Sequence, residues 1–173
     1  SSENWKRPQP ELDFLMHLLE QYLVEERATL LREQIRLTVI GRREGIPASV
    51  QDDMDRTVAM TAGRAGLNLC LAINCGARGE IVDAVRRIAA DAQAGIIDPA
   101  SLDEATIEAK LYTAGMPDPD LLIRTAGEMR FSNYLLWQIS YAEFWVTETC
   151  WPEFREPQLH AAIRDYAARN RKF

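Results

Sequence analysis

The sequence predicts an α/β protein in which helices flank a parallel β-sheet. Three observations support this class. Short β-branched or apolar segments alternate with segments of helical periodicity, short polar turns connect them, and residues 67–73 are apolar almost throughout, as in a strand that helices cover on both faces. Of the 173 residues, 47% are hydrophobic, so we expect residues 1–173 to form a single domain with one core.

The first half of the chain is expected to hold two strands and three helices. Apolar residues recur at helical spacing over 10–33, and the prolines before them suit a helix start, where N–H groups have no internal partner. The β-branched segment 35–40 and the apolar segment 67–73 predict the strands. Helical patterns over 48–65 and 81–94 follow them, which is the order of a parallel sheet with crossover helices.

The second half continues this alternation. The expected elements are a short helix over 103–111 capped by Ser101, a strand over 121–123, a helix over 133–144, a strand over 145–147 and a terminal helix over 157–171. These strands and amphipathic helices leave apolar sheet edges that nothing covers, and the chain begins without methionine. We therefore expect the sheet to lack one or more N-terminal strands.

Composition argues against several classes of protein. The net charge of −6 and the pI near 5.0 argue against a general nucleic-acid binder, which would present a basic face. Cys70, Cys75 and Cys150 have no metal-like spacing, so we expect free thiols in a cytoplasmic protein, Cys70 and Cys75 being buried. No apolar run reaches the roughly 18 to 20 residues of a membrane span. His17 and His160 lie in helical patterns and are expected to be structural.

Residues 120–133 carry the clearest functional pattern in the chain. Arg124 and Arg130, with Glu128 between them and Ser132 after them, lie in the turn that follows an apolar strand. Strand ends of parallel sheets are common ligand sites, and two arginines across a turn can grip a diphosphate as bidentate forks. The alternative is a strand–turn–helix connection whose charges are only solvated. The whole constellation favours the anion clamp.

The opening segment places further polar groups before the first helix. Ser1, Asn4 and Arg7 supply a hydroxyl, an amide and a guanidinium, with Trp5 among them. Donors at a helix start suit an anionic group. A capped helix entrance with Trp5 as a hydrophobic staple explains the same residues equally well.

Two other features have simpler interpretations. The turn over 74–78 follows a strand end in the same topological position, and we expect a plain strand–helix connection that uses Gly76 for backbone freedom. Glu143 lies beside Tyr141 and Phe144 on the helix expected to start after Ser132. Such a carboxylate either pairs with an arginine or helps to hold a divalent cation, and the spacing alone favours the ion pair.

Three segments resemble the cis-prenyltransferases, in particular the bacterial undecaprenyl-diphosphate synthases. Residues 1–8, Ser-Ser-Glu-Asn-Trp-Lys-Arg-Pro, resemble the family's opening segment, and 74–78, Asn-Cys-Gly-Ala-Arg, resemble its Asn-Tyr-Gly-Gly-Arg turn. Residues 120–138, with Tyr-Ala-Glu at 141–143 and Trp-Pro-Glu-Phe at 151–154, resemble its most diagnostic block. The resemblance runs from Ser1 to Phe173.

This resemblance implies an activity and its requirements. The family condenses isopentenyl diphosphate onto an allylic diphosphate such as farnesyl diphosphate, with growth of the chain in an apolar tunnel and a need for magnesium. The product implied is a cis-polyprenyl diphosphate that serves as a lipid carrier for cell-wall synthesis and is delivered to the membrane. A homodimer, cytoplasmic or peripheral at the membrane, is implied as well, with no role for nucleic acid.

The resemblance also implies roles for individual residues. Isopentenyl diphosphate would bind Arg124, Arg130 and Ser132, with Glu128 supporting their loop and Glu143 placing magnesium. Ser1, Asn4 and Arg7 would orient the diphosphate or assist proton removal. The site would be shaped by Trp5, and the tunnel would be lined by Leu15, Leu18 and Leu19.

One departure from the family pattern bears on activity. The family's N-terminal motif, with its magnesium-binding aspartate and phosphate-cradling loop, matches no part of the 173 residues, so we expect this chain alone to be inactive. The alternative function is a non-catalytic scaffold subunit of the same fold that binds a catalytic partner. Such subunits usually lose the arginine–serine block, whereas Arg124, Arg130 and Ser132 are intact here.

Overall fold

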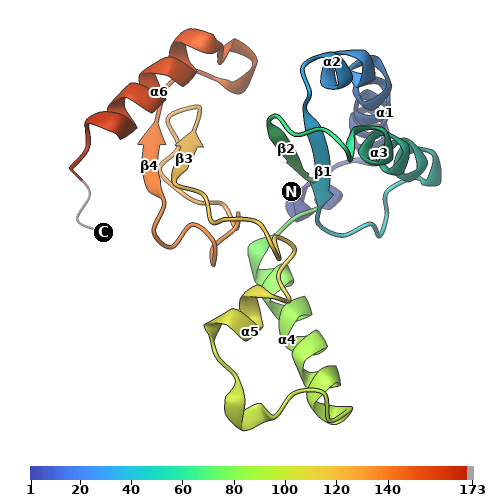
Figure 1. Ribbon diagram of the computed structural model, residues 1–173. Coiled ribbons are helices and arrows are strands. Elements are labelled where there is room, and N and C mark those ends of the chain that lie inside the picture. Colours follow the sequence, from blue (N-terminus) through green and yellow to red (C-terminus); the bar gives the residue numbers. More distant parts are fainter. Residues whose placement is uncertain (171–173) are drawn as a thin grey trace. The chain divides into compact units, whose positions relative to one another are not determined.

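The computed structural model describes residues 1–170, and the chain divides into two compact units (Figure 1). The first comprises Ser1–Ala114 and the second begins at Gly115. Within the described range, each unit contains one two-stranded parallel sheet with a helix packed on it. The predicted α/β class with parallel strands and flanking helices is confirmed, although the strands of the described residues pair two by two.

The first unit is built on two parallel strands, β1 (Arg36–Ile40) and β2 (Asn68–Ala72), whose register runs from Arg36 opposite Asn68 to Ile40 opposite Ala72. Its helices and 3-10 turns are η1 (Ser2–Lys6), α1 (Gln9–Glu25), α2 (Arg27–Arg32), α3 (Ala48–Thr61), α4 (Ala77–Gln93), η2 (Pro99–Ser101) and α5 (Glu104–Glu108). Both strands lie where the sequence predicts them.

The core of the first unit lies where α1, α2 and α3 meet β1. It contains the buried side chains of Leu23, Leu30, Leu37, Ile46, Val50 and Met54. The helix predicted over 10–33 is divided at Glu26 into α1 and α2. Leu23 of α1 and Leu30 of α2 both belong to this cluster, so the two helices on either side of the break share one core.

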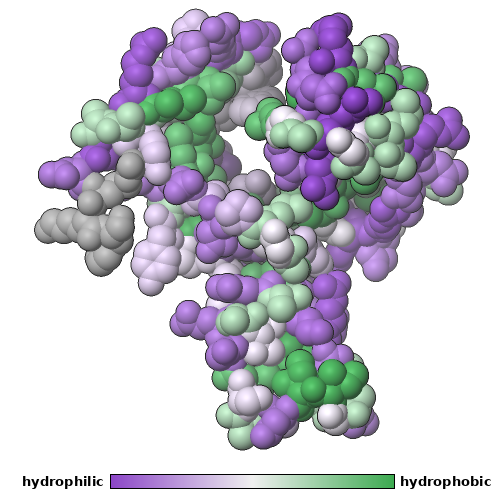
Figure 2. Space-filling view, in the orientation of Figure 1, coloured by the Kyte–Doolittle hydropathy of each residue, from purple (hydrophilic) through white to green (hydrophobic). Residues whose placement is uncertain are grey.

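The second unit has its own strand pair and one long helix. Strand β3 (Leu121–Arg124) pairs in parallel with β4 (Glu143–Val146), so that Leu121 lies opposite Glu143. The 3-10 turn η3 (Trp151–Glu153) precedes α6 (Glu156–Ala168). Figure 2 shows hydrophobic residues beneath the largely hydrophilic outer face of α6, where this helix packs on β4. Arg171, the predicted end of this helix, lies outside the described residues.

The prediction of a helix over 133–144 is wrong. Residues 132–141 form turns, and Glu143 begins β4 instead of lying on a helix. Ser132, Asn133 and Leu135 have φ values of 48°, 58° and 42°, a left-handed conformation that cannot continue a right-handed helix. Buried Leu135 and Ile139 have helical spacing, but they take part in a single i to i+4 bond, from Ile139 N to Leu135 O at 3.0 Å.

The predicted cap of the short helix also needs correction. Asp103, not Ser101, caps α5: the backbone N–H of Thr106 donates to Asp103 Oδ1 at 2.8 Å. Ser101 belongs to η2, where its hydroxyl donates to Asp98 O at 2.8 Å. The carboxylate lies directly before the helix and reaches its free N–H groups, whereas Ser101 is already used in the preceding turn. None of the described helices is both long and apolar enough to cross a membrane.

Candidate functional site

The carboxyl ends of β1 and β2 approach each other closely at Gly41. Gly41 has a φ of 110°, and a Cβ atom on it would overlap the carbonyl oxygen of Ile73. The N–H of Ile73 donates to Ile40 O at 2.9 Å, and the N–H of Ser2 donates to Cys75 O at 2.8 Å. The opening segment is therefore bound to the loop that follows β2. Cys75 itself is a buried free thiol, and burial raises its pKa to about 11.

A small pocket of about 180 Å³ lies beside this segment. Its apolar side chains are Leu12, Leu15, Met16, Leu19, Ala72 and Ile73, and its polar side chains are Ser1, Asn4 and Asn74, with Trp5 between the two kinds. Five of the predicted site residues thus come together here: Ser1, Asn4, Trp5, Leu15 and Leu19. The arrangement combines a polar rim with an apolar wall.

Two predicted residues of the same region do not line this pocket. Leu18 is half-buried on α1 but is not part of the pocket lining. Arg7 is exposed, with Nε donating to Asn4 Oδ1 at 3.0 Å and Nη1 paired with Glu11. Arg7 therefore reaches the rim of the pocket through Asn4.

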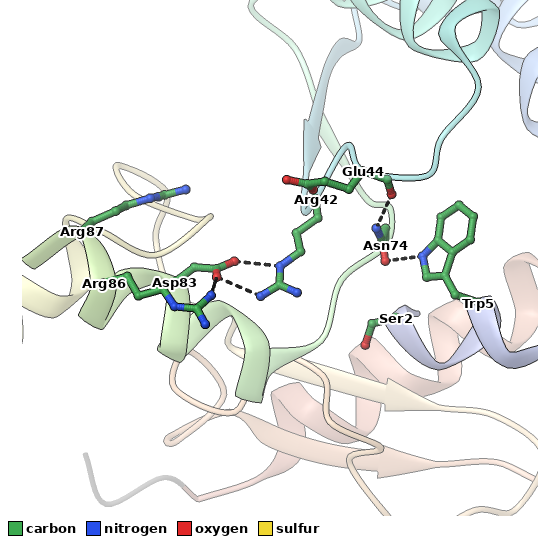
Figure 3. A pocket seen from close by; sticks show the side chains of 8 residues that line it. All are labelled: Ser2, Trp5, Arg42, Glu44, Asn74, Asp83, Arg86 and Arg87. Atoms are coloured by element: carbon green, nitrogen blue, oxygen red, sulfur yellow. Dashed lines mark hydrogen bonds and ion pairs between the residues drawn. The ribbon is translucent and has the colours of Figure 1, made fainter. Parts of the chain in front are cut away.

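A larger, polar cavity of about 660 Å³ adjoins the same residues (Figure 3). It is lined by Ser2, Trp5, Arg42, Glu44, Asn74, Asp83, Arg86 and Arg87. Arg42 donates from Nε and Nη2 to both oxygens of Asp83 at 2.8 Å, and the hydroxyl of Tyr112 donates to the same carboxylate. This network joins the loop after β1 to α4.

The charges of this network shift each other's ionisation. The hydrogen bonds from Arg42 hold the pKa of Asp83 below its usual value, with a further contribution from the Tyr112 hydroxyl. Burial, followed by the hydrogen bond to Asp83, raises the pKa of Tyr112 to about 12. Asp83 therefore stays ionised and Tyr112 stays neutral at ordinary pH.

In the second unit, the loop after β3 gathers the predicted clamp. Arg124 Nη2 and Arg130 Nη2 donate to different oxygens of Glu128, and Arg124 Nη2 also lies 3.2 Å from Ser132 Oγ. The Nε atom of Arg124 is buried and has no hydrogen-bond partner among residues 1–170. A buried donor without a partner is costly, so this atom is a candidate contact for an anionic ligand.

Backbone bonds and a glycine hold this loop against the segment after β4. The N–H groups of Ala126 and Gly127 donate to Thr149 O at 3.1 Å and Thr147 O at 2.9 Å. Ala126 and Gly127 have φ values of 61° and 64°, and a Cβ on Gly127 would lie 2.5 Å from Glu148 Oε2. The left-handed conformation is strained at Ala126, which is not a glycine, and such strain clusters at ligand sites.

Glu143 is paired with an arginine, as its spacing suggests. Its Oε2 accepts from Arg169 Nη1 at 2.5 Å, and Arg169 also pairs with Asp165. Residues 1–170 contain no group of three or more histidine, cysteine or acidic side chains able to enclose a metal ion. This donor set fits magnesium only where one carboxylate is joined by substrate phosphates and water, which is the usual protein contribution to such sites.

The sequence interpretation missed the role of Asn74. Gly76, which was expected to provide backbone freedom, has an extended φ of −159° that any residue adopts. Asn74 instead takes the left-handed conformation, with φ 51°, and its side chain bonds to both Trp5 and Glu44. The available signal was an asparagine directly after a strand, a residue that tolerates this conformation and binds nearby backbone.

Comparison with known proteins identifies the family. Residues 1–173 match the family model described as "Putative undecaprenyl diphosphate synthase". The chain belongs to this family. It is therefore a cis-prenyltransferase, an enzyme of isoprenoid biosynthesis, and the predicted resemblance is confirmed.

Two curated relatives of this family member are named isoprenyl transferases. The protein of Rhodopirellula baltica is 48% identical over 173 residues, which cover 100% of this chain and 71% of that relative. The protein of Geobacter sulfurreducens is 44% identical, with 100% of this chain and 70% of that relative covered.

Solved structures of the same family share the fold. Lavandulyl diphosphate synthase from Lavandula x intermedia, in complex with dimethylallyl diphosphate, matches with a TM-score of 0.95 and 37% identity, covering 98% of this chain and 74% of that one. A probable undecaprenyl diphosphate synthase from Campylobacter jejuni matches with a TM-score of 0.85 and 32% identity, covering 99% and 78%.

Proposed function

We propose that this prenyltransferase condenses isopentenyl diphosphate onto an allylic prenyl diphosphate, such as farnesyl diphosphate, to form a cis-polyprenyl diphosphate. The observation that carries the proposal is the clamp after β3, in which Arg124 and Arg130 converge on Glu128 while the buried Arg124 Nε is left for a ligand. The lavender relative, solved with dimethylallyl diphosphate, binds an allylic prenyl diphosphate, which supports the substrate class.

The clamp would bind the diphosphate of isopentenyl diphosphate. Guanidinium groups recognise phosphate oxygens through paired, charge-assisted hydrogen bonds, and the Ser132 hydroxyl adds another donor. Glu128, which accepts from both arginines, holds their forks in one orientation before the ligand arrives. Binding the diphosphate this way fixes the position of the substrate's double bond, which accelerates a reaction between two bound molecules.

The opening segment and its pocket would bind the prenyl substrate. Each methylene buried against Leu15 and Leu19 contributes roughly 0.8 kcal/mol, so an apolar wall suits an isoprenoid chain. We assign Leu18 to the same tunnel further along α1. Ser1 and Asn4, on the polar rim, would orient the diphosphate or assist proton removal, and Arg7 would reach the diphosphate beside Asn4.

Magnesium is the proposed cofactor, with Glu143 as its ligand in this chain. When bound, magnesium neutralises charge that develops on the diphosphate leaving group. Arg169 holds the Glu143 carboxylate at the start of β4, which orients it for such a ligand role. We expect that residues 1–173, a single domain in this proposal, do not turn over by themselves.

The biological setting is part of the same proposal. The product would be a lipid carrier for cell-wall synthesis that is delivered to the membrane. The protein would act as a homodimer in the cytoplasm, with peripheral contact to the membrane and no role for nucleic acid.

The test is a titration of the chain with isopentenyl diphosphate by calorimetry, which requires no turnover. We expect Arg130→Ala to weaken binding on the order of 10- to 100-fold, because a charge-assisted pair of hydrogen bonds is lost. Arg130 is largely exposed, so the stability of the Arg130→Ala protein should change little. Arg32→Ala is the matched control, since Arg32 is equally exposed and also paired with a glutamate.

Two results would count against the proposal. One is absence of isopentenyl diphosphate binding by the unsubstituted chain, which would favour a non-catalytic scaffold subunit. The other is equal loss of binding and of thermal stability in Arg130→Ala, which would make the clamp a structural feature of the loop.

A further inference from the structure

Asn74 lies between β2 and α4 and bonds to two other segments of the first unit. Its Nδ2 donates to the backbone oxygen of Glu44 at 3.1 Å, and its Oδ1 accepts from the indole N–H of Trp5. Figure 3 shows Asn74 between these two partners. The amide therefore joins the loop after β1 to the opening segment, using both its donor and its acceptor.

The Trp5 ring is held from a second direction by Gly45. A Cβ atom on Gly45 would lie 3.3 Å from two carbons of the indole, so the glycine backbone lies directly against the ring. Gly45 has a φ of 81°, which favours glycine at this position. Because the oxygen of the neighbouring Glu44 is bound by Asn74, one amide restrains both the indole and the turn that supports it.

Trp5 and Asn74 also line both cavities of this unit. They belong to the apolar pocket that contains Leu15 and Leu19, and to the polar cavity that contains Arg42. Their hydrogen bond therefore lies in the wall that the two cavities share. If the indole turned away, apolar side chains would be open to a cavity lined with charges, where water competes for the space.

We propose that Asn74 is a positioning residue, which fixes the Trp5 indole as the wall between the apolar pocket and the polar cavity. The consequence for ligands rests on the proposed function: the apolar pocket keeps its shape, and excludes water, only while Asn74 holds the indole. Asn74 acts through Trp5 and needs no contact with the reacting atoms.

Two substitutions separate the side chain of Asn74 from its backbone conformation. Asn74→Gly removes the amide and keeps the left-handed φ without strain. Asn74→Asp loses the donor to Glu44 O but keeps an acceptor for the indole N–H and tolerates the same φ, so it isolates the bond to Trp5. Gln34→Gly is the matched control, because Gln34 is exposed, has a φ of 56° and follows a helix away from both cavities.

The first readout is the Trp5 indole N–H in proton–nitrogen correlation spectra, assigned by its absence in Trp5→Phe. In Asn74→Gly we expect this proton to exchange with solvent about tenfold faster or more, because a hydrogen bond is lost. Asn74→Asp and Gln34→Gly should retain the original exchange. An unchanged resonance in Asn74→Gly, or an equal change in Gln34→Gly, would overturn the proposal.

The second readout is affinity for farnesol, a neutral prenyl alcohol that avoids repulsion by the aspartate of Asn74→Asp. We expect about tenfold weaker binding in Asn74→Gly and binding within about twofold of the original in Asn74→Asp. Equal farnesol affinity in all variants would overturn the positioning role. Failure of the unsubstituted chain to bind farnesol or farnesyl diphosphate would instead refute the proposed function, and the indole exchange would still decide whether Asn74 holds Trp5.

Discussion

The loop after β2 and the loop after β3 both follow the carboxyl end of a parallel strand, but they use their polar groups differently. In the loop over 74–76, Asn74 gives both ends of its amide to other parts of the protein. In the loop over 125–133, Arg124 and Arg130 share one carboxylate, and the buried Arg124 Nε has no partner among residues 1–170. The first loop joins structural segments, whereas the second keeps donors for a ligand.

The two loops also differ in how many of their residues have a left-handed backbone conformation. Asn74 is the one left-handed residue of the first loop, and α4 follows it directly. The second loop has left-handed conformations at Ala126, Gly127, Ser132 and Asn133, and turns follow it. In residues other than glycine, such conformations cost of order 1–3 kcal/mol each and persist where other interactions compensate them. The comparison therefore predicts large stability effects in the first region and large binding effects in the second.

The largest expected effect is on stability at Gly41, which follows β1 and lies against Ile73, the residue directly before the first loop. Gly41→Ala should lower the free energy of unfolding by about 3 kcal/mol or more, because its Cβ meets the backbone oxygen of Ile73 and its φ is left-handed. Gly127→Ala should cost less, about 1 kcal/mol, since its Cβ meets only the movable carboxylate of Glu148. Urea unfolding measures both.

Gly63→Ala is the control for these variants, because no atom lies within 4 Å of a Cβ at Gly63. It should change stability by about 0.5 kcal/mol at most. A larger loss of stability for Gly127→Ala than for Gly41→Ala would reverse the comparison between the two regions.

A smaller effect is expected for Arg124→Lys, this time on binding. Lysine keeps the charge but loses the planar fork and the buried Nε donor, so affinity for isopentenyl diphosphate should fall about tenfold. Calorimetric titration measures the affinity, and Arg32→Lys serves as a control on an exposed arginine. Full affinity in Arg124→Lys would show that charge alone suffices and that the fork geometry is irrelevant.

The smallest effect is the pH dependence of Asp83. Its pKa is lowered in the folded protein by Arg42, so its stabilisation is complete above the unfolded value near 3.9 and is lost as pH falls through the lower folded value. Asp83→Asn should cost about 1 kcal/mol at pH 7, and this cost should shrink as pH falls below the unfolded value. Unfolding curves from pH 7 down to about pH 2.5 test this.

Asp55→Asn provides the comparison for Asp83, because Asp55 also pairs with an arginine but is more than half exposed. Its cost at pH 7 should be smaller, since water and salt screen an exposed pair. Equal costs for the two variants would show that the partly buried Arg42–Asp83 network contributes no more than a surface ion pair.

The sequence determined the elements and the residue types of the candidate site. Strands β1, β2 and β3 lie close to their predicted ranges because apolar and β-branched runs are local properties of the chain. The grouping of Arg124, Glu128, Arg130 and Ser132 could also be predicted, since these residues are neighbours in sequence and follow a strand. The sequence also favoured an ion pair for Glu143, although it did not identify which arginine is the partner.

Tertiary structure alone decided the features that join distant segments. The turns over 132–141 replaced a predicted helix because left-handed residues and the parallel pairing of β4 with β3 outweighed a helical apolar pattern. Asn74 reaches Trp5, 69 positions away in the sequence, only because β1 and β2 close at Gly41 and bring the opening segment to that edge. Periodicity reports which face of an element is buried, whereas such contacts depend on how the elements pack.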